Sequence, residues 1–314
     1  MSTVAILAPL SVAACFGLLG PHLARRLPPR DATWLISIGA VVSALSAVAV
    51  LGLLGTVLLG QLPDLASLGH WSSSTLRRRS PIEPGIGALS LLAVLVSGVA
   101  AAFVGARRAL AVLAAYRACG GIAAEGDLVV IDGTQPSAVA VPGRPGRIVV
   151  SRSLLRLLSP GERRVLLAHE RAHLSAGHHW HRSAVALAIA ANPLLTPLSG
   201  AITYATERWA DERAAADLGD RRGTARALAR VALLTGRSAR QGEPRLAIGR
   251  QAVSARVSAL LSDAPTPQPM LALATIALLT LGLLATLMVE KEIEHLFELA
   301  GHVYRTAATR GGAG

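Results

Sequence analysis

Charged and aromatic residues are both scarce in this sequence. Charged residues make up 16% of its 314 positions against 52% apolar residues, a balance that excludes an ordinary water-soluble enzyme. Aromatic residues amount to 3%, too few to form the stacking surfaces with which proteins hold single-stranded nucleic acid. We therefore expect no nucleic-acid binding, and we assign the net charge of +12 to contact with lipid headgroups and to membrane topology.

Cysteine and lysine are scarcer still. Cys15 and Cys119 are far apart, and Cys15 lies inside an apolar stretch, so we expect no disulfide framework and no thiolate metal site. Residues 12–15 resemble a lipoprotein cleavage box, but no basic residue precedes them, and we do not expect lipidation. Lys291 is the only lysine, and this preference for arginine is typical of a GC-rich bacterial genome. We expect a multi-pass protein of the bacterial plasma membrane.

Long apolar stretches are what the sequence has in abundance. Four of them reach the length of about 20 residues that a membrane-spanning helix needs: 4–20, 34–59, 86–104 and 270–289. The pattern predicts an integral-membrane, mainly α-helical protein with an α+β domain between the third and fourth spans. The expected parts are three spans in residues 1–105, a domain in 106–268, the fourth span in 269–290 and a short tail in 291–314.

The arginines predict an orientation in the bilayer. Arg25, Arg26 and Arg30 follow the first apolar stretch and none precedes it, so we expect the N-terminus outside and the first loop inside. The domain between the third and fourth spans is then cytoplasmic. Residues 77–79, three arginines in a loop placed outside, oppose this assignment, whereas the arginines at 107–108 favour it.

The domain mixes short strands with helices. Three short β-type runs with an intervening Pro-Gly turn predict a small antiparallel sheet, at 128–131, 137–141 and 147–150. Ser159 followed by Glu162 predicts the capping box of a helix. A later helix near 207–216 is expected to end at Gly219, and amphipathic helices are expected near 224–234 and 247–261.

The helix that begins at Ser159 carries the pattern His169-Glu170-Arg171-Ala172-His173. Two histidines four residues apart on a helix face one side, at a spacing that suits two imidazoles on one tetrahedral zinc ion. Glu170 lies beside them, close enough to take a proton from a zinc-bound water without binding the metal. We therefore predict a Zn²⁺ site with Glu170 as the general base.

Two residues compete to be the third protein ligand. His179 stands where a HExxHxxGxxH pattern places its last histidine, but that pattern needs glycine at position 176, where this chain has Ala176. Glu207 is the other candidate, and we favour it because Asp211 shares its helix face and can accept a hydrogen bond from a ligating imidazole. His178, His179 and His181 are then expected to be polar residues where the helix leaves the core, with a weak accessory metal site as the alternative.

The uncharged segment 183–206 is long enough to suggest a fifth span. A single crossing would separate Glu207 from the two histidines, and two crossings need about 40 residues. Asn192-Pro193 and Pro197 also interrupt a helix there. We expect a buried or membrane-surface helix pair that returns to the same side and brings the site close to the bilayer.

The HERAH motif followed by ERWADERAA resembles the integral-membrane gluzincins, in which a Glu-x-x-Ala-Asp helix completes HExxH. Both the BlaR/MecR antirepressor metallopeptidases and the HtpX and CAAX-prenyl proteases fit, over about residues 126–217, and three spans before the domain with one after it resemble BlaR/MecR more closely. The resemblance implies that His169, His173 and Glu207 bind zinc and that Glu170 is catalytic. Residues 291–314 are too few for a penicillin-binding sensor, so we do not expect direct β-lactam sensing.

The resemblance implies a zinc metalloendopeptidase. We expect it to cleave a protein or peptide substrate, such as a transcriptional repressor, in regulatory signalling. The alternatives are an HtpX-like protease for quality control of membrane proteins and a non-catalytic zinc-binding signal transducer. Zincins hold an extended peptide along an edge strand, for which 137–141 and 147–151 are the candidates.

Overall fold

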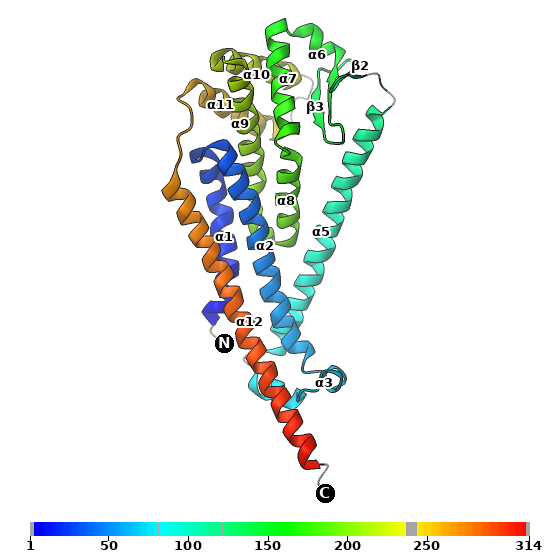
Figure 1. The fold of residues 1–314 in the computed structure, drawn as a ribbon, viewed down its shortest axis with the longest axis vertical. Coiled ribbons are helices and arrows are strands. Elements are labelled where there is room, and N and C mark those ends of the chain that lie inside the picture. Colours follow the sequence, from blue (N-terminus) through cyan, green and yellow to red (C-terminus); the bar gives the residue numbers. More distant parts are fainter. Residues whose placement is uncertain (1–2, 81, 121, 123, 237–243, 312–314) are drawn as a thin grey trace.

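A computed structural model of the protein describes residues 3–80, 82–120, 122, 124–236 and 244–311. Four long apolar helices dominate it: α1 (Thr3–Arg26), α2 (Pro29–Leu59), α5 (Pro84–Cys119) and α12 (Pro269–Gly311). All four are long and apolar enough to cross a membrane, as the sequence predicts. Figure 1 shows α1, α2 and α12 side by side, with α5 leaning away from them toward the sheet.

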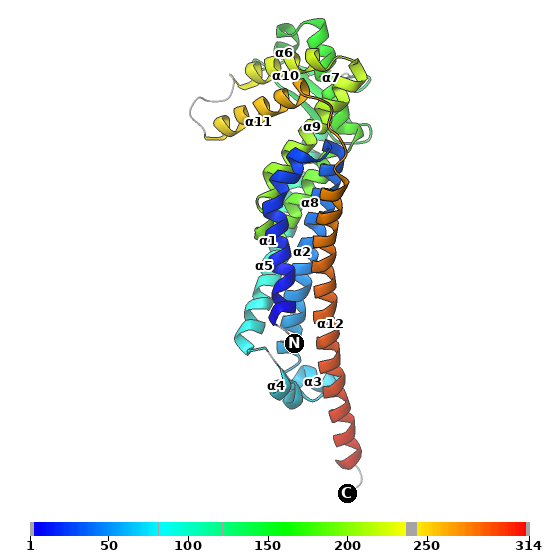
Figure 2. The ribbon, with the colours of Figure 1, turned by 90° about the vertical axis from the view of Figure 1, so that its left-hand side faces the viewer.

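All four helices extend beyond the apolar stretches that predict them, and α5 and α12 do so furthest. α5 runs on past residue 104 to Cys119, beside the sheet. α12 continues as one helix to Gly311, through most of the segment that we expected to be a short tail. The short helices α3 (Pro63–Gly69) and α4 (Ser73–Arg79) lie beside the C-terminal half of α12, at the end of the molecule away from the sheet (Figure 2).

The sheet is mixed, so the expectation of a purely antiparallel sheet is wrong. Its strands β1 (Ala124–Glu125), β2 (Leu128–Ile131), β3 (Ala138–Val141) and β4 (Arg147–Ser151) lie in the order β1-β2-β4-β3. β4 pairs parallel with β2 and antiparallel with β3. Burial explains this order. Ile148, Val149 and Val150 of β4 are all buried, and a strand that is buried on both faces lies inside a sheet, whereas the shorter β3 lies at an edge.

Seven further helical segments follow the sheet. They are α6 (Arg152–Leu157), α7 (Pro160–Ser175), α8 (His178–Ala191), the 3₁₀ turn η1 (Pro193–Leu195), α9 (Leu198–Leu218), α10 (Arg221–Gly236) and α11 (Pro244–Leu261). The predicted capping box of Ser159 and Glu162 opens α7. The predicted stop at Gly219 is also confirmed, because this residue ends α9 in the left-handed conformation with φ of +66°.

Helices α8 and α9 form a hairpin that packs against the apolar helices. The 14 residues of α8 are too few to cross a bilayer, and Asn192 ends the helix by accepting a hydrogen bond from the backbone N–H of Leu194. One buried apolar cluster joins the hairpin to α1 and α2, with Val185, Leu195 and Leu198 against Phe16 and Ile36. Segment 183–206 is therefore a buried helix pair that returns to its starting side, as predicted.

The hairpin fits against α1 only because residue 17 has no side chain. A Cβ atom on Gly17 would lie 2.5 Å from the backbone carbonyl oxygen of Leu194, in the turn between α8 and α9. We predict that Gly17→Ala lowers the free energy of unfolding by about 1–3 kcal/mol, because the turn has to move away. Gly52→Ala is the matched control, since nothing lies within 4 Å of a Cβ there. Thermal unfolding in detergent measures both, and equal melting temperatures for the two variants would contradict this packing.

Candidate metal centre

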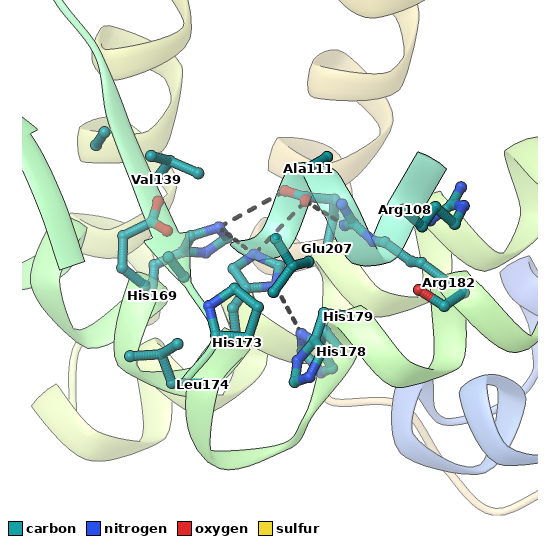
Figure 3. Close-up of a pocket in the computed structure, with 16 residues that line it drawn as sticks. Arg108, Ala111, Val139, His169, His173, Leu174, His178, His179, Arg182 and Glu207 are labelled. Carbon is teal, nitrogen blue, oxygen red and sulfur yellow. Dashed lines mark hydrogen bonds and ion pairs between the residues drawn. The ribbon is translucent and has the colours of Figure 1, made fainter. Parts of the chain in front are cut away.

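Helix α7 presents His169 and His173 to a common point. Their Nε2 atoms lie 3.1 Å apart, and the two rings meet edge to face. The four-residue spacing produces this approach, because residues one turn apart lie on the same helix face. Figure 3 shows both imidazoles turned toward Glu207.

Glu207 approaches the histidines from α9. Its two carboxylate oxygens lie 3.6 Å from His169 Nε2 and 3.5 Å from His173 Nε2. The three residues form a group whose ligand atoms all lie within 4.8 Å of one another, and this group does not include His179. Ligand atoms at about 2.0–2.1 Å from a tetrahedral zinc ion are about 3.3 Å from each other. The observed separations of 3.1, 3.5 and 3.6 Å are close to that value, so the residues present fit a zinc ion.

Asp211 lies behind His169, one helical turn after Glu207. Its Oδ1 is 3.0 Å from His169 Nδ1, and the residue is only 1% exposed. A carboxylate in this position keeps the proton on Nδ1 and leaves Nε2 free for a metal. The role of Asp211 as the partner of a ligating imidazole stays a prediction, and the structure places its carboxylate next to one.

Two arginines that the sequence analysis did not single out hold the carboxylates in place. Arg256 of α11 donates two hydrogen bonds to Asp211, of 2.7 and 2.6 Å, and its Nη1 lies 2.8 Å from Glu207. Arg182 of α8 donates to the other Glu207 oxygen at 2.6 Å and to Thr206 Oγ1 at 2.9 Å. Glu207 is therefore fixed from two sides by residues far away in the sequence.

The histidines of α8 do not lie where a helix leaves the core, so that expectation is wrong. His178 is 1% exposed, and its Nδ1 is 2.7 Å from Nδ1 of His173. His181 is also buried, with its Nδ1 2.8 Å from Ser37 Oγ on α2. The reason is the hairpin, which keeps α8 inside the molecule. His179, the rejected ligand candidate, is half-buried and lines the cavity in front of the site.

The electrostatic field of the site favours a cation between the imidazoles. Burial favours a neutral ring, yet Asp211 and Glu207 outweigh it and raise the pKa of His169 to about 9. Burial and the neighbouring charge of His169 lower the pKa of His173 to about 3. His169 can then donate from Nε2 to Nε2 of His173, so a proton bridges the two ligand atoms. A metal ion would replace that proton.

The carboxylate of Glu207 is held in the ionised form that a ligand needs. Burial opposes ionisation, but His169 and Arg256 hold the pKa of Glu207 well below its usual range.

Glu170 meets the requirements for a general base. It is buried next to His169, and burial raises the pKa of its carboxyl group, an effect that His169 and the backbone N–H of Ala140 partly oppose. A raised pKa makes a carboxylate a better proton acceptor near neutral pH. Glu170 does not belong to the group of three ligand residues, as expected for a base.

Two cavities meet at these residues and follow strand β3. The larger, of about 500 Å³, contains Val139, Ala140, Arg108 and Arg182 in its lining, and the smaller, of about 380 Å³, contains Ala138 and Val231. Both are also lined by His169, Glu170 and Glu207. β3 pairs only with β4, so it is an edge strand of the sheet, with β1 at the opposite edge, and β4 is excluded as an edge strand. The N–H of Ser151 donates to the carbonyl of Ser137, so this pair is hydrogen-bonded between β4 and β3. In an antiparallel pair of strands, every second residue is hydrogen-bonded to the partner strand. The backbone N–H and C=O groups of Ala138 and Ala140 therefore point away from β4, toward the cavities.

Residues 106–212 match the family model described as Peptidase family M48. The match supports membership of the M48 zinc metallopeptidase family, which implies a protease that is generally zinc-dependent. It contains His169, Glu170, His173, Glu207 and Asp211, whereas Arg256 lies beyond it. No curated protein and no solved structure matches the chain.

The choice between the two ligand candidates can be tested by metal content. We predict that Glu207→Ala lowers the zinc content of the detergent-purified protein, because it removes one of three converging ligands. His179→Ala is expected to retain zinc, since His179 lies outside the group. Elemental analysis after dialysis measures both variants. Zinc loss in His179→Ala alone would show that the ligand assignment is wrong.

His178 is expected to hold His173 in the tautomer that leaves Nε2 unprotonated. Partners of this kind typically contribute about 10- to 100-fold to metal affinity. We predict that His178→Ala weakens zinc binding by about that factor, as measured by competition with a chelator. His181→Ala is the control, because His181 bonds to Ser37 and to neither ligand histidine. Equal affinities in the two variants would exclude this role.

Proposed function

We propose that the protein is a membrane-embedded, zinc-dependent endopeptidase of a cytoplasmic or membrane-proximal protein substrate. The observation that carries the proposal is the position of Glu170. This buried carboxylate lies beside the His169–His173–Glu207 group and in the lining of both cavities along the free edge of β3. A site that only bound zinc would not need a base there.

The proposed reaction is hydrolysis of a peptide bond. His169, His173 and Glu207 would hold a zinc ion, which would supply the Lewis acidity that makes a water molecule acidic near neutral pH. Glu170 takes a proton from the attacking water, whose oxygen adds to the carbonyl carbon. Glu170 then returns the proton to the amide nitrogen as the C–N bond breaks, so the products are a free carboxylate and a free amine.

An extended peptide suits the shape of the site. The outward N–H and C=O groups of β3 can bond to a substrate main chain that adds to the edge of the sheet. The smaller cavity has apolar side chains from α10 and α11, which can accept an apolar substrate side chain: Leu228, Val231, Ala232, Val253 and Val257.

The hairpin supports the proposal of a membrane-proximal substrate. α8 carries Arg182 into the site and packs against α2 and α5, which are both candidate membrane spans. Arg107 and Arg108 end the apolar part of α5 close to the larger cavity, and the arginine pattern favours the cytoplasmic side. We propose a regulatory role such as repressor cleavage in a bacterial plasma membrane, with quality control of membrane proteins as the alternative.

The role of Glu170 is separable from metal binding. We predict that Glu170→Gln keeps its zinc but loses proteolysis by at least about 100-fold, because the amide cannot accept the proton. Glu125→Gln, an exposed change on β1, is the control. Zinc content and cleavage of a denatured protein substrate are measured on the same samples. If Glu170→Gln preserves the cellular phenotype and His169→Ala abolishes it, the protein is a binding transducer and no protease.

A further inference from the structure

The larger cavity is positively charged at the end that α5 closes. Within the described part of the chain, its only acidic lining residues are Glu170 and Glu207, which the catalytic site already uses. Its arginines are Arg108 from α5 and Arg182 from α8. Figure 3 shows the two arginine side chains on the same side of Glu207, away from His169.

Arg182 cannot turn away to neutralise another group. Its guanidinium is fixed by Thr206 and by Glu207, at 2.9 and 2.6 Å. Its charge still faces the cavity, because Arg182 lines it together with His173 and Glu170. Glu207 offsets part of this charge, but its carboxylate also forms an ion pair with Arg256 and lies next to the two histidines.

Arg108 is exposed and available, and its backbone position is fixed. No ion pair joins it to any other residue that the structure describes. Helix α5 is attached to the rest of the site on both sides of Arg108. Ser97 Oγ donates to the carbonyl of Ala191 at 2.7 Å, and Tyr116 Oη donates to the carbonyl of Arg144 at 3.0 Å. The backbone of Arg108 is therefore fixed at the rim of the cavity, and its side chain lines the cavity with its N–H donors available to a ligand.

We propose that Arg108 binds a carboxylate of the peptide substrate, so that the enzyme selects substrates with an acidic group on the α5 side of the cleaved bond. This inference rests on the proposed protease function. A guanidinium suits a carboxylate because its N–H groups can donate two parallel hydrogen bonds to the two oxygens. Arg182 adds positive charge to the same end of the cavity. The carboxylate comes from an Asp or Glu side chain or from the C-terminus of the peptide.

The test measures peptide binding to the zinc-loaded, full-length Glu170→Gln protein in detergent, so that the preference is read without turnover. The probes are mixtures of short amidated peptides with Asp, Asn or Lys fixed at one position at a time. We expect Asp to bind about tenfold more tightly than Asn at a position on one side of the centre, and the difference to shrink as salt is raised. A preference for free over amidated C-termini in Asn peptides identifies the terminal carboxylate as the source.

Charge changes at two neighbouring arginines assign the effect. Arg108→Gln is expected to remove the preference for a carboxylate, and Arg108→Glu to reverse it in favour of Lys. Arg107→Gln is the control: Arg107 is also exposed, but it lies 5.7 Å from the Phe103 ring and does not line the cavity. Equal binding of carboxylate and amide peptides, or a preference that survives Arg108→Gln, overturns the inference. If the parent protein cleaves no peptide, the proposed function fails, whereas the binding comparison still decides the role of Arg108.

Discussion

The placement of two carboxylates on one face of α9, with Asp211 buried and Glu207 partly buried, is the constraint on which the rest of the site depends. Glu207 and Asp211 are one turn apart, and neither can be buried and ionised without cationic partners. Arg256 bridges both from α11, Arg182 approaches from α8, and the two histidines approach from α7. Four helices are thereby brought together around one point. Even with these partners, the negative charges of Asp211 and Glu207 raise the pKa of His169, as expected for a site that holds a further cation.

The α8–α9 hairpin connects this cluster to the apolar helices α1 and α2. It leaves the site at His178 and returns to it at Glu207, and its turn rests on α1 at Gly17. Helix α7, which carries His169 and His173, is thus supported by the hairpin on the apolar helices and by the sheet, whose edge strand β3 faces the cavities. Rigid support of this kind lets a metal site keep its geometry while the cleft remains open to a long substrate.

The periodicity of the sequence predicts the residues on α7 and α9, because helical spacing alone places His169 with His173 and Glu207 with Asp211. The same pattern, with the prolines of segment 183–206, predicts the return of the hairpin. Arg256 could not be found in this way, since it contacts Asp211 across 45 positions of sequence and lies on an ordinary amphipathic helix. The place of His178 and the mixed sheet were also missed, because burial by distant elements decides both. Local sequence carries little information on such contacts.

The central claim is that two imidazoles and one carboxylate share a zinc ion with an open position. X-ray absorption at the zinc edge, recorded on the detergent-purified protein loaded with one equivalent of zinc, tests it most directly. The account predicts two nitrogen ligands with the scattering of imidazole rings and the remaining ligands oxygen, at about 2.0–2.2 Å. In Glu207→Gln the two imidazoles should remain and the oxygen shell should change. A spectrum with three imidazoles or with only one would contradict the account.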